Sequence, residues 1–122
     1  MRDSKLIDSS VWIAYLFNGL YSNIIDSNEI LLLSCLSIFE IKKKLLKDKV
    51  ETSKIVKSIE FIKKRSLMIE VSDEIAEKAA DFSIDKKLPM VDSLIYITAI
   101  LNQATLITLD NDFRNLKNAV VL

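Results

Sequence analysis

Histidine is absent from this chain, and cysteine, proline and glycine each occur only once among its 122 residues. The lack of histidine excludes Ser-His-Asp and Cys-His catalysis, and it excludes metal sites that use imidazole ligands. The single cysteine, Cys35, excludes an intramolecular disulfide and a zinc site built from cysteines. It lies in an apolar run, where we expect it to be buried in the core. Any catalysis must therefore depend on carboxylates, lysines, hydroxyls or a hard metal ion.

The scarcity of glycine and proline indicates short connections between regular elements, with no linker or disordered segment. The length suits one domain, and the hydrophobic share of 50% is enough for a core. We therefore predict a single domain over residues 1–122. The net charge is zero, so no overall field attracts a polyanion. If four acids were gathered in one site, however, the rest of the molecule would carry an excess of four positive charges.

Long apolar runs are also absent. The N-terminal residues lead into only two apolar side chains before Asp8, which is too few for a signal peptide. The longest apolar stretch, around residues 30–39, is interrupted by serines and is too short to cross a bilayer. We therefore expect a cytoplasmic protein without a membrane partner.

Short apolar runs alternate with amphipathic segments along the whole chain. Strands are predicted at residues 6–7, 30–33, 67–71 and 105–108, with a short last strand at 119–122. Helices are predicted at 11–17, 20–26, about 35–47, about 53–64, after Ser72, and about 90–102. This alternation predicts an α/β fold in which helices cover both faces of a mainly parallel sheet of four to five strands.

Several side chains have an expected place within these helices. Ser9 or Ser10, Ser34 or Ser37, and Ser72 are candidate N-caps, and Gly19 suits a left-handed helix end. The inward faces are predicted to include the following apolar residues: Ile38, Ile41, Leu45 and Leu46; Ile55, Val56, Ile59 and Ile62; Ile75, Ala76, Ala79 and Phe82. The basic runs at 42–44 and 63–65 are expected on solvated helix faces, with contact to phosphates as the alternative.

The first predicted helix is apolar on nearly every side, more than one buried stripe requires. We therefore expect part of it to contact another chain, through a groove formed by Trp12, Tyr15, Leu16 and Phe17.

Four acids are placed at corresponding positions relative to the predicted strands. Asp8 follows the first strand, Glu40 lies in the first two turns of the helix after the second, Asp92 lies in the first turn of its helix, and Asp110 follows the fourth strand. The carboxyl ends of parallel strands share one edge of a sheet, so at least three of these acids should meet there. Each has a structural explanation of its own: Asp8 and Asp92 as helix N-terminal acids, and Asp110 as a turn residue.

Four like charges at one edge repel one another unless a cation neutralises them. Mg²⁺ and Mn²⁺ prefer oxygen ligands and bridge to phosphate oxygens. Such a site would hold a metal-activated water in line with a phosphodiester and would stabilise the leaving oxygen.

The segments around these acids resemble the PIN-domain nucleases, and within them the VapC-type toxins of toxin–antitoxin pairs. The resemblance rests on Leu6-Ile7-Asp8-Ser9-Ser10-Val11, on Ile38-Phe39-Glu40-Ile41, on Val91-Asp92-Ser93-Leu94-Ile95, and on the segment from Leu106 to Phe113. It covers almost the whole chain, and its specificity lies in the order of four short motifs. It implies a three-layer α/β/α fold, Mg²⁺- or Mn²⁺-dependent endoribonuclease activity on RNA, inhibition by a cognate antitoxin, and a homodimer.

The same resemblance assigns roles to individual residues. Asp8, Glu40, Asp92 and Asp110 would be the catalytic, metal-binding acids, and Asp112 would be an additional or alternate ligand. Ser10 and Thr108 would orient water or the Asp8 carboxylate. Ser93 stands where the family most often has alanine, and the Asp110/Asp112 pair leaves open which acid lies nearer the ion.

Other functions agree less well with the sequence. A receiver domain would need an acid pair after the first strand and a lysine after the last one, but two serines follow Asp8 and the chain ends at Leu122. A PIN-like scaffold that only binds RNA or protein predicts the loss of an acid, and all four are present. That scaffold and a PIN-domain nuclease of RNA maturation stay open as alternatives, although maturation nucleases usually carry further domains.

Overall fold

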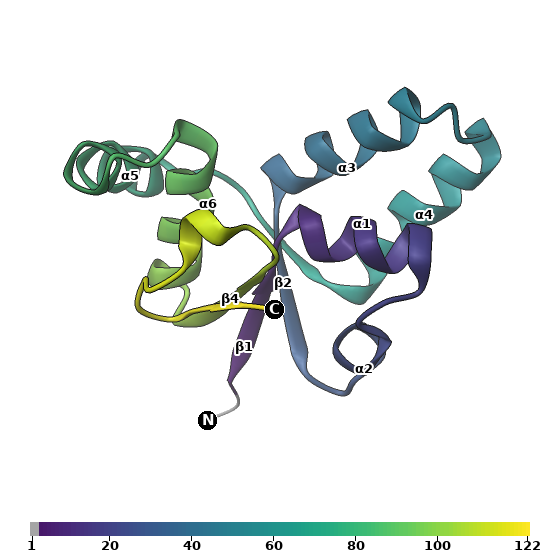
Figure 1. The fold of residues 1–122 in the computed structure, drawn as a ribbon, viewed down its shortest axis with the longest axis horizontal. Helices are drawn as coiled ribbons and strands as arrows, with labels where there is room; N and C mark the ends of the chain where they lie inside the picture. The colour runs from purple at the N-terminus through teal and green to yellow at the C-terminus, as the bar shows by residue number, and fades with distance from the viewer. Residues whose placement is uncertain (1–2) are drawn as a thin grey trace.

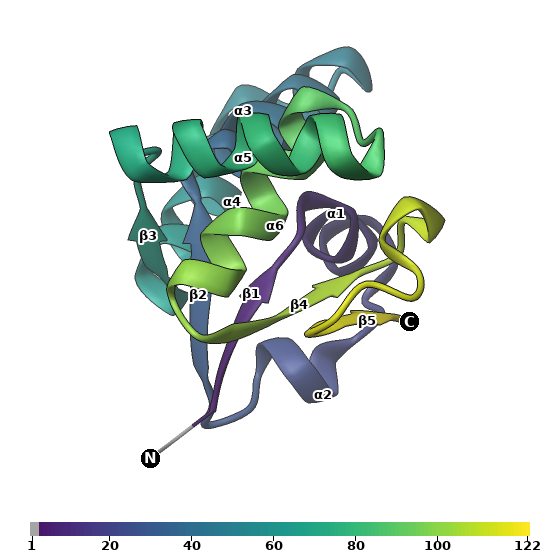
Figure 2. The ribbon, with the colours of Figure 1, turned by 90° about the vertical axis from the view of Figure 1, so that its left-hand side faces the viewer.

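Five short strands form one parallel sheet in the order β3-β2-β1-β4-β5 in the computed structural model, which describes residues 3–122 (Figures 1 and 2). The strands are β1 (Ser4–Ile7), β2 (Ile30–Ser34), β3 (Leu67–Ile69), β4 (Ala104–Thr108) and β5 (Ala119–Val121). Every neighbouring pair is parallel. The central strand β1 pairs with β2 on one side and with β4 on the other. The predicted mainly parallel sheet is thus confirmed, with five strands.

Helices cover both faces of the sheet, giving the expected three layers (Figure 1). They are α1 (Ser9–Asn18), α2 (Ser22–Ile25), α3 (Cys35–Lys47), α4 (Thr52–Arg65), α5 (Asp73–Lys86) and α6 (Met90–Leu101), and a 3-10 turn spans Asn111–Phe113. Helices α1, α3 and α4 pack on one face, and α5 and α6 pack on the other. Within residues 3–122 no helix combines the length and the apolar character needed to cross a membrane.

The core is divided between the two faces by the two-residue alternation of the strands. Leu6 and Leu106, paired across β1 and β4, point toward α5 and α6. Ile7 and Ile107, the next pair along, point toward α1, α3 and α4. All four side chains are at most 3% exposed. The buried centre of the sheet therefore holds the carboxyl ends of β1 and β4 rigidly in position.

The ends of several elements lie where the sequence predicts them. Ser34 and Ser72 are N-caps whose hydroxyls accept from the backbone N–H groups of Leu36 and Ile75. Gly19 ends α1 with a φ of 66°, a left-handed conformation that glycine adopts without strain. Helix α3 ends at Lys47 as predicted.

Some predicted core residues are exposed. Leu46 is 58% exposed and Val56 is 49% exposed, and Ala76 also faces solvent. Each lies one position beyond a buried helix residue, so the apolar stripe of each helix is narrower than the sequence pattern suggests. On α3 the small polar Ser37 is buried together with Ile41 and Leu45. Cys35, expected in the core, is only half-buried at the start of α3.

Helix α1 also differs from its expected role. Trp12 is fully buried among residues of α3 and α4, so it cannot line a surface groove for a partner. Its ring meets Tyr15 and Phe61 edge-on, with centroids 6.3 and 6.4 Å away. Tyr15 and Leu16 are half-buried, and Phe17 is 40% exposed. Much of the apolar excess of α1 is therefore used inside the molecule.

Arg65, the last residue of α4, was expected on a solvated face and instead binds backbone. Its guanidinium donates hydrogen bonds to the carbonyl of Ile25, the last residue of α2, and to those of Ser27 and Glu29 in the connection to β2. The other basic residues of the two runs are exposed.

Candidate metal centre

Asp8 lies at the carboxyl end of the central strand, in the N-cap position of α1. Its carboxylate does not cap that helix. Instead, Oδ2 accepts hydrogen bonds from Ser10 Oγ at 2.9 Å and from Thr108 Oγ1 at 2.8 Å. With 8% of its surface exposed, the side chain is held at the edge of the sheet with two donors on one oxygen. Asp8 therefore occupies the N-cap position of α1, but its carboxylate binds Ser10 and Thr108 and not the helix N-terminus.

The two hydroxyls that bind Asp8 also bind the segment after β4. Ser10 Oγ accepts from the backbone N–H of Leu109 at 3.1 Å, and Thr108 Oγ1 accepts from that of Asp110 at 3.0 Å. They therefore connect the ends of two neighbouring strands and fix Asp8 relative to Asp110. Ser10 and Thr108, the candidate positioning residues, therefore lie directly beside Asp8 and Asp110.

Glu40 reaches the same edge from the second turn of α3. Ser9 Oγ donates to its Oε1 at 3.2 Å. Burial raises the pKa of Glu40 above its usual range, the negative charge of Asp8 raises it further, and the hydrogen bond from Ser9 opposes both. The sequence predicts Ser9 as a candidate helix cap, and it does not reveal this contact with Glu40.

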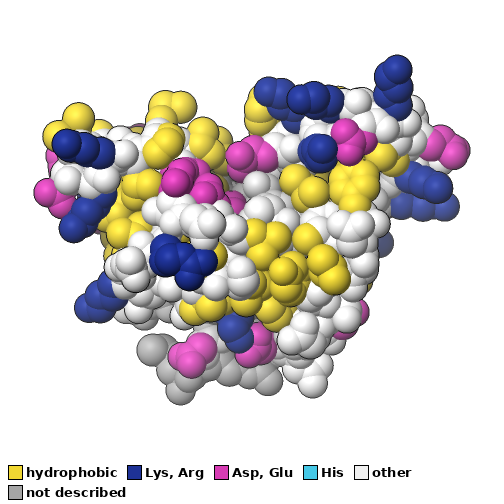
Figure 3. Space-filling model, in the orientation of Figure 1, with side chains coloured by type: hydrophobic (Ala, Val, Ile, Leu, Met, Phe, Trp, Pro, Cys, Tyr) yellow, Lys and Arg dark blue, Asp and Glu magenta, His cyan; other side chains and the backbone are white. Residues whose placement is uncertain are grey.

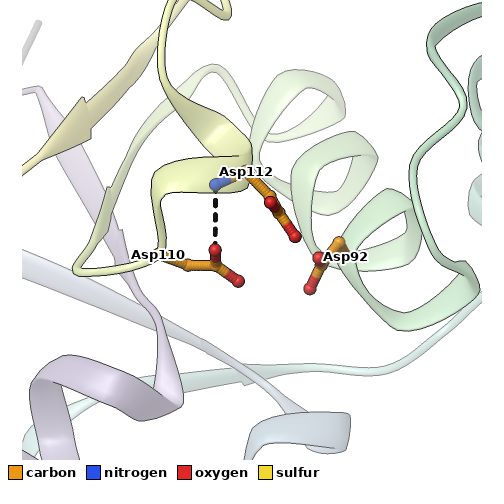
Figure 4. A group of neighbouring side chains, drawn as sticks. All are labelled: Asp92, Asp110 and Asp112. Atoms are coloured by element: carbon orange, nitrogen blue, oxygen red, sulfur yellow. Dashed lines mark hydrogen bonds between the residues drawn. The ribbon is translucent and has the colours of Figure 1, made fainter.

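Three aspartates lie closest together. Asp92 projects from the first turn of α6, and Asp110 and Asp112 project from the turn after β4, so that the side chains of Asp92 and Asp112 point toward one another (Figure 4). One carboxylate oxygen from each of the three lies within 4.8 Å of the others. The Asp112 backbone N–H donates to Asp110 Oδ1 at 2.9 Å, which orients the Asp110 carboxylate. Within residues 3–122 this is the group whose geometry suits a metal ion.

The electrostatics of Asp92 connect all five acids. Its pKa is raised to about 6, mainly by burial and then by the charges of Asp110, Asp8, Asp112 and Glu40, in that order. Asp8 and Glu40 are outside the group of three, yet their charges act on it. The structure thus places the five candidate acids at one edge of the sheet and brings Asp92, Asp110 and Asp112 within reach of a common ion.

The donor set fits a hard divalent cation. Its ligand atoms are carboxylate oxygens, which Mg²⁺ and Mn²⁺ prefer, and the chain offers no imidazole in competition. The three aspartates are half-buried or exposed, so an ion there would keep open positions for water and for a phosphate oxygen. A divalent ion held by these carboxylates would place positive charge next to a bound phosphodiester.

Comparison with known proteins agrees with this architecture. The chain is similar to a toxin–antitoxin complex chain from Klebsiella pneumoniae (TM-score 0.78, 23% identity, 96% of each chain covered). It is also similar to a chain of VapBC2 from Rickettsia felis bound to a promoter DNA fragment (TM-score 0.79, 15% identity, 98% and 97% covered). A third similar structure is VapC20 from Mycobacterium tuberculosis, a toxin that cleaves the sarcin-ricin loop (TM-score 0.70, 15% identity, 89% and 92% covered).

At these identities the structural likeness establishes the fold. No curated protein sequence matches the chain. The family model of the PIN domain matches residues 5–119, which include all five acids and nearly the whole sheet. This chain therefore belongs to the PIN domain family.

Proposed function

We propose that this chain is a metal-dependent endoribonuclease of the VapC toxin type, acting in the cytoplasm as a single domain over residues 1–122. The convergence of Asp92, Asp110 and Asp112 within 4.8 Å is the observation that carries the proposal. A cognate antitoxin as inhibitor and a homodimer belong to the same proposal. The similarity to chains of toxin–antitoxin complexes supports the antitoxin, and the RNA-cleaving activity of VapC20 supports RNA as the substrate.

Each acid has a distinct role in this proposal. Asp92, Asp110 and Asp112 hold Mg²⁺ or Mn²⁺, with Asp8 beside them at the buried end of the edge. When bound, the ion supplies positive charge to the phosphate oxygens and activates a water for attack on the phosphodiester. Ser10 and Thr108 hold the Asp8 carboxylate in place, and Ser9 holds Glu40.

Proton transfer is assigned to the half-buried carboxyls. In the metal-free site, a pKa of about 6 leaves Asp92 partly protonated near neutral pH. Metal binding favours its ionised form, so Asp92 acts as a ligand when the ion is present. Glu40, which lies outside the group of three and also has a raised pKa, is the acid left to accept a proton from the attacking water.

The proposal predicts RNA cleavage that requires both metal and the aspartates. Purified protein should cut single-stranded RNA with Mg²⁺ or Mn²⁺ and stop when EDTA is added. Asp8→Asn and Asp92→Asn should each lower the rate by about two or more orders of magnitude, because each removes a negative charge from the site. Gel analysis of end-labelled RNA measures the rates, and circular dichroism checks that each variant is folded.

Glu77→Gln on α5 is the matched control, because Glu77 is an exposed acid whose charge is not among those that act on Asp92. It should cleave at the wild-type rate. Wild-type rates in Asp92→Asn, or undiminished cleavage in EDTA, would refute the metal-dependent mechanism. A folded protein that binds RNA and never cuts it would instead support the scaffold alternative.

A further inference from the structure

A groove runs along α3 from the candidate metal centre. It has a volume of about 400 Å³, and its lining includes Glu40 and Ser9 at one end and lysines of α3 along its length. Ile13, Leu36 and Val91 form an apolar part of its wall, and Val91 directly precedes Asp92. Figure 3 shows the same relation on the surface: acidic side chains lie in the notch between the α5–α6 part and α3, and basic side chains lie over α3.

Two of the groove lysines carry uncompensated charge. Lys44 is paired with Asp48 at 3.2 Å. Lys43 and Lys47 form no ion pair within residues 3–122, and both are exposed to solvent. These two positive charges therefore border a groove that contains Glu40, and Val91 of its wall directly precedes Asp92. Positive charge beside a candidate cation site suits a polyanion that passes that site.

An exposed aromatic ring stands beside them. Phe39 is 66% exposed and directly precedes Glu40 on α3. The ammonium of Lys43 lies over its ring, 5.7 Å from the centroid. An aromatic face next to unpaired lysines is the combination that binds single-stranded nucleic acid, with a base stacked on the ring and phosphates at the lysines.

We propose that this groove, the α3 groove, binds the single-stranded RNA substrate next to the scissile phosphate, with Lys43 and Lys47 contacting phosphates and Phe39 stacking on a base. The proposal rests on the proposed ribonuclease function and extends it by naming binding residues outside the metal centre. The unpaired, exposed lysines favour a polyanion as the occupant over an apolar segment, which offers them no charge partner.

The test measures RNA binding separately from cleavage. Fluorescence anisotropy of a short labelled single-stranded RNA, in EDTA and over a series of NaCl concentrations, gives the affinity and its salt dependence. Each phosphate contact contributes about 0.7 to the slope of log K against log salt for single strands. The double variant Lys43→Ala, Lys47→Ala should therefore lower the slope by about 1.4.

Phe39→Leu tests the stacking contact by a different readout. It should weaken binding by about 5- to 100-fold with an unchanged salt slope, because stacking involves no counterion release. The matched control is the double variant Lys63→Ala, Lys64→Ala on α4, which removes two exposed lysines outside the groove and should leave slope and affinity unchanged.

Equal slopes for the groove variant and the wild type would overturn the proposal, as would an equal loss in the control on α4. Either result would assign the groove to a protein segment or to solvent. Failure of the proposed function looks different. In that case wild-type protein leaves RNA uncut with Mg²⁺ or Mn²⁺, whatever the salt slopes show.

Discussion

The pKa of the Asp92 carboxyl depends on the charges of the other four candidate acids. Its raised pKa means that the folded protein holds a proton on this group at pH values where the unfolded chain, with a usual pKa near 3.9, has released it. Above a pH of about 6 the folded state must carry the charge next to Asp110, Asp8, Asp112 and Glu40. The metal-free folded state is therefore destabilised by the repulsion among these candidate acids.

The first prediction concerns stability against pH. Between pH 4 and pH 6 the folded state binds more protons than the unfolded state, so the free energy of unfolding in EDTA should fall as the pH rises. Asp92→Asn removes much of this fall. At pH 7 it should be more stable than the wild type by about 1 to 2 kcal/mol, a value that allows for the solvent screening of a half-buried group.

Urea titrations at several pH values in EDTA measure these differences. Glu77→Gln, which changes an exposed acid, should follow the wild-type curve. A lower stability of Asp92→Asn at pH 7 would mean that this carboxylate stabilises the start of α6 as a first-turn acid, and that its charge is not in conflict with the others.

At the residue scale the sequence predicted positions better than contacts. Asp8 and Asp110 could be placed at one edge because each directly follows an apolar run that becomes a parallel strand. The hydrogen bond from Ser9 to Glu40 could not be predicted, because it depends on how α1 and α3 pack across 31 residues of sequence. A Ser-Ser pair after a strand-end acid is the pattern that could have suggested one hydroxyl for each of two carboxylates.

At the scale of elements, the bounds of helices follow local chemistry and their faces follow packing. Ser34 and Ser72 cap their helices through their own backbone neighbours, so the sequence is sufficient. Leu46 and Val56 are exposed because the sheet and the adjacent helices cover only one narrow stripe of α3 and α4. The width of the buried stripe depends on tertiary packing. It therefore cannot be derived from the apolar periodicity of a single helix.

Arg65 provides a prediction for a single element, the connection between α2 and β2. Arg65→Ala should lower the free energy of unfolding by about 1.5 to 3 kcal/mol, because it leaves the carbonyls of Ile25, Ser27 and Glu29 without their charged donor. Arg65→Lys should recover only part of this loss, since one ammonium cannot reproduce the guanidinium geometry. Chemical denaturation measures all three proteins.

Lys64→Ala, one residue earlier on the same helix, is the control and should change stability by less than about 0.5 kcal/mol. An Arg65→Ala protein that is as stable as Lys64→Ala would show that water replaces the guanidinium at these carbonyls.

At the scale of the whole molecule, the acids come from both layers of helices. Glu40 lies on α3 on one face of the sheet, Asp92 lies on α6 on the other, and Asp110 follows the strand between them. A divalent ion at this edge would therefore neutralise charges from parts of the chain that otherwise repel one another.

We accordingly predict that Mg²⁺ stabilises the entire domain. At ten times its dissociation constant it should add about 1.4 kcal/mol, which corresponds to a rise in Tm of roughly 3 to 6 °C for a domain of this size. Asp92→Asn should lose most of this rise, and Glu77→Gln should keep it. Differential scanning fluorimetry with and without Mg²⁺ measures the shifts. Equal shifts in all three proteins would indicate that the ion binds elsewhere.

The pairing of β1 with β4 has a consequence for synthesis on the ribosome. Ser4 to Ile7 are translated 100 residues before their partners Ala104 to Ile107. While translation proceeds, Asp8 has neither the hydroxyl of Thr108 nor the carboxylates of Asp110 and Asp112 beside it. A nascent chain that has not yet reached β4 therefore lacks the candidate metal centre, which can form only once β4 and the turn after it have left the exit tunnel.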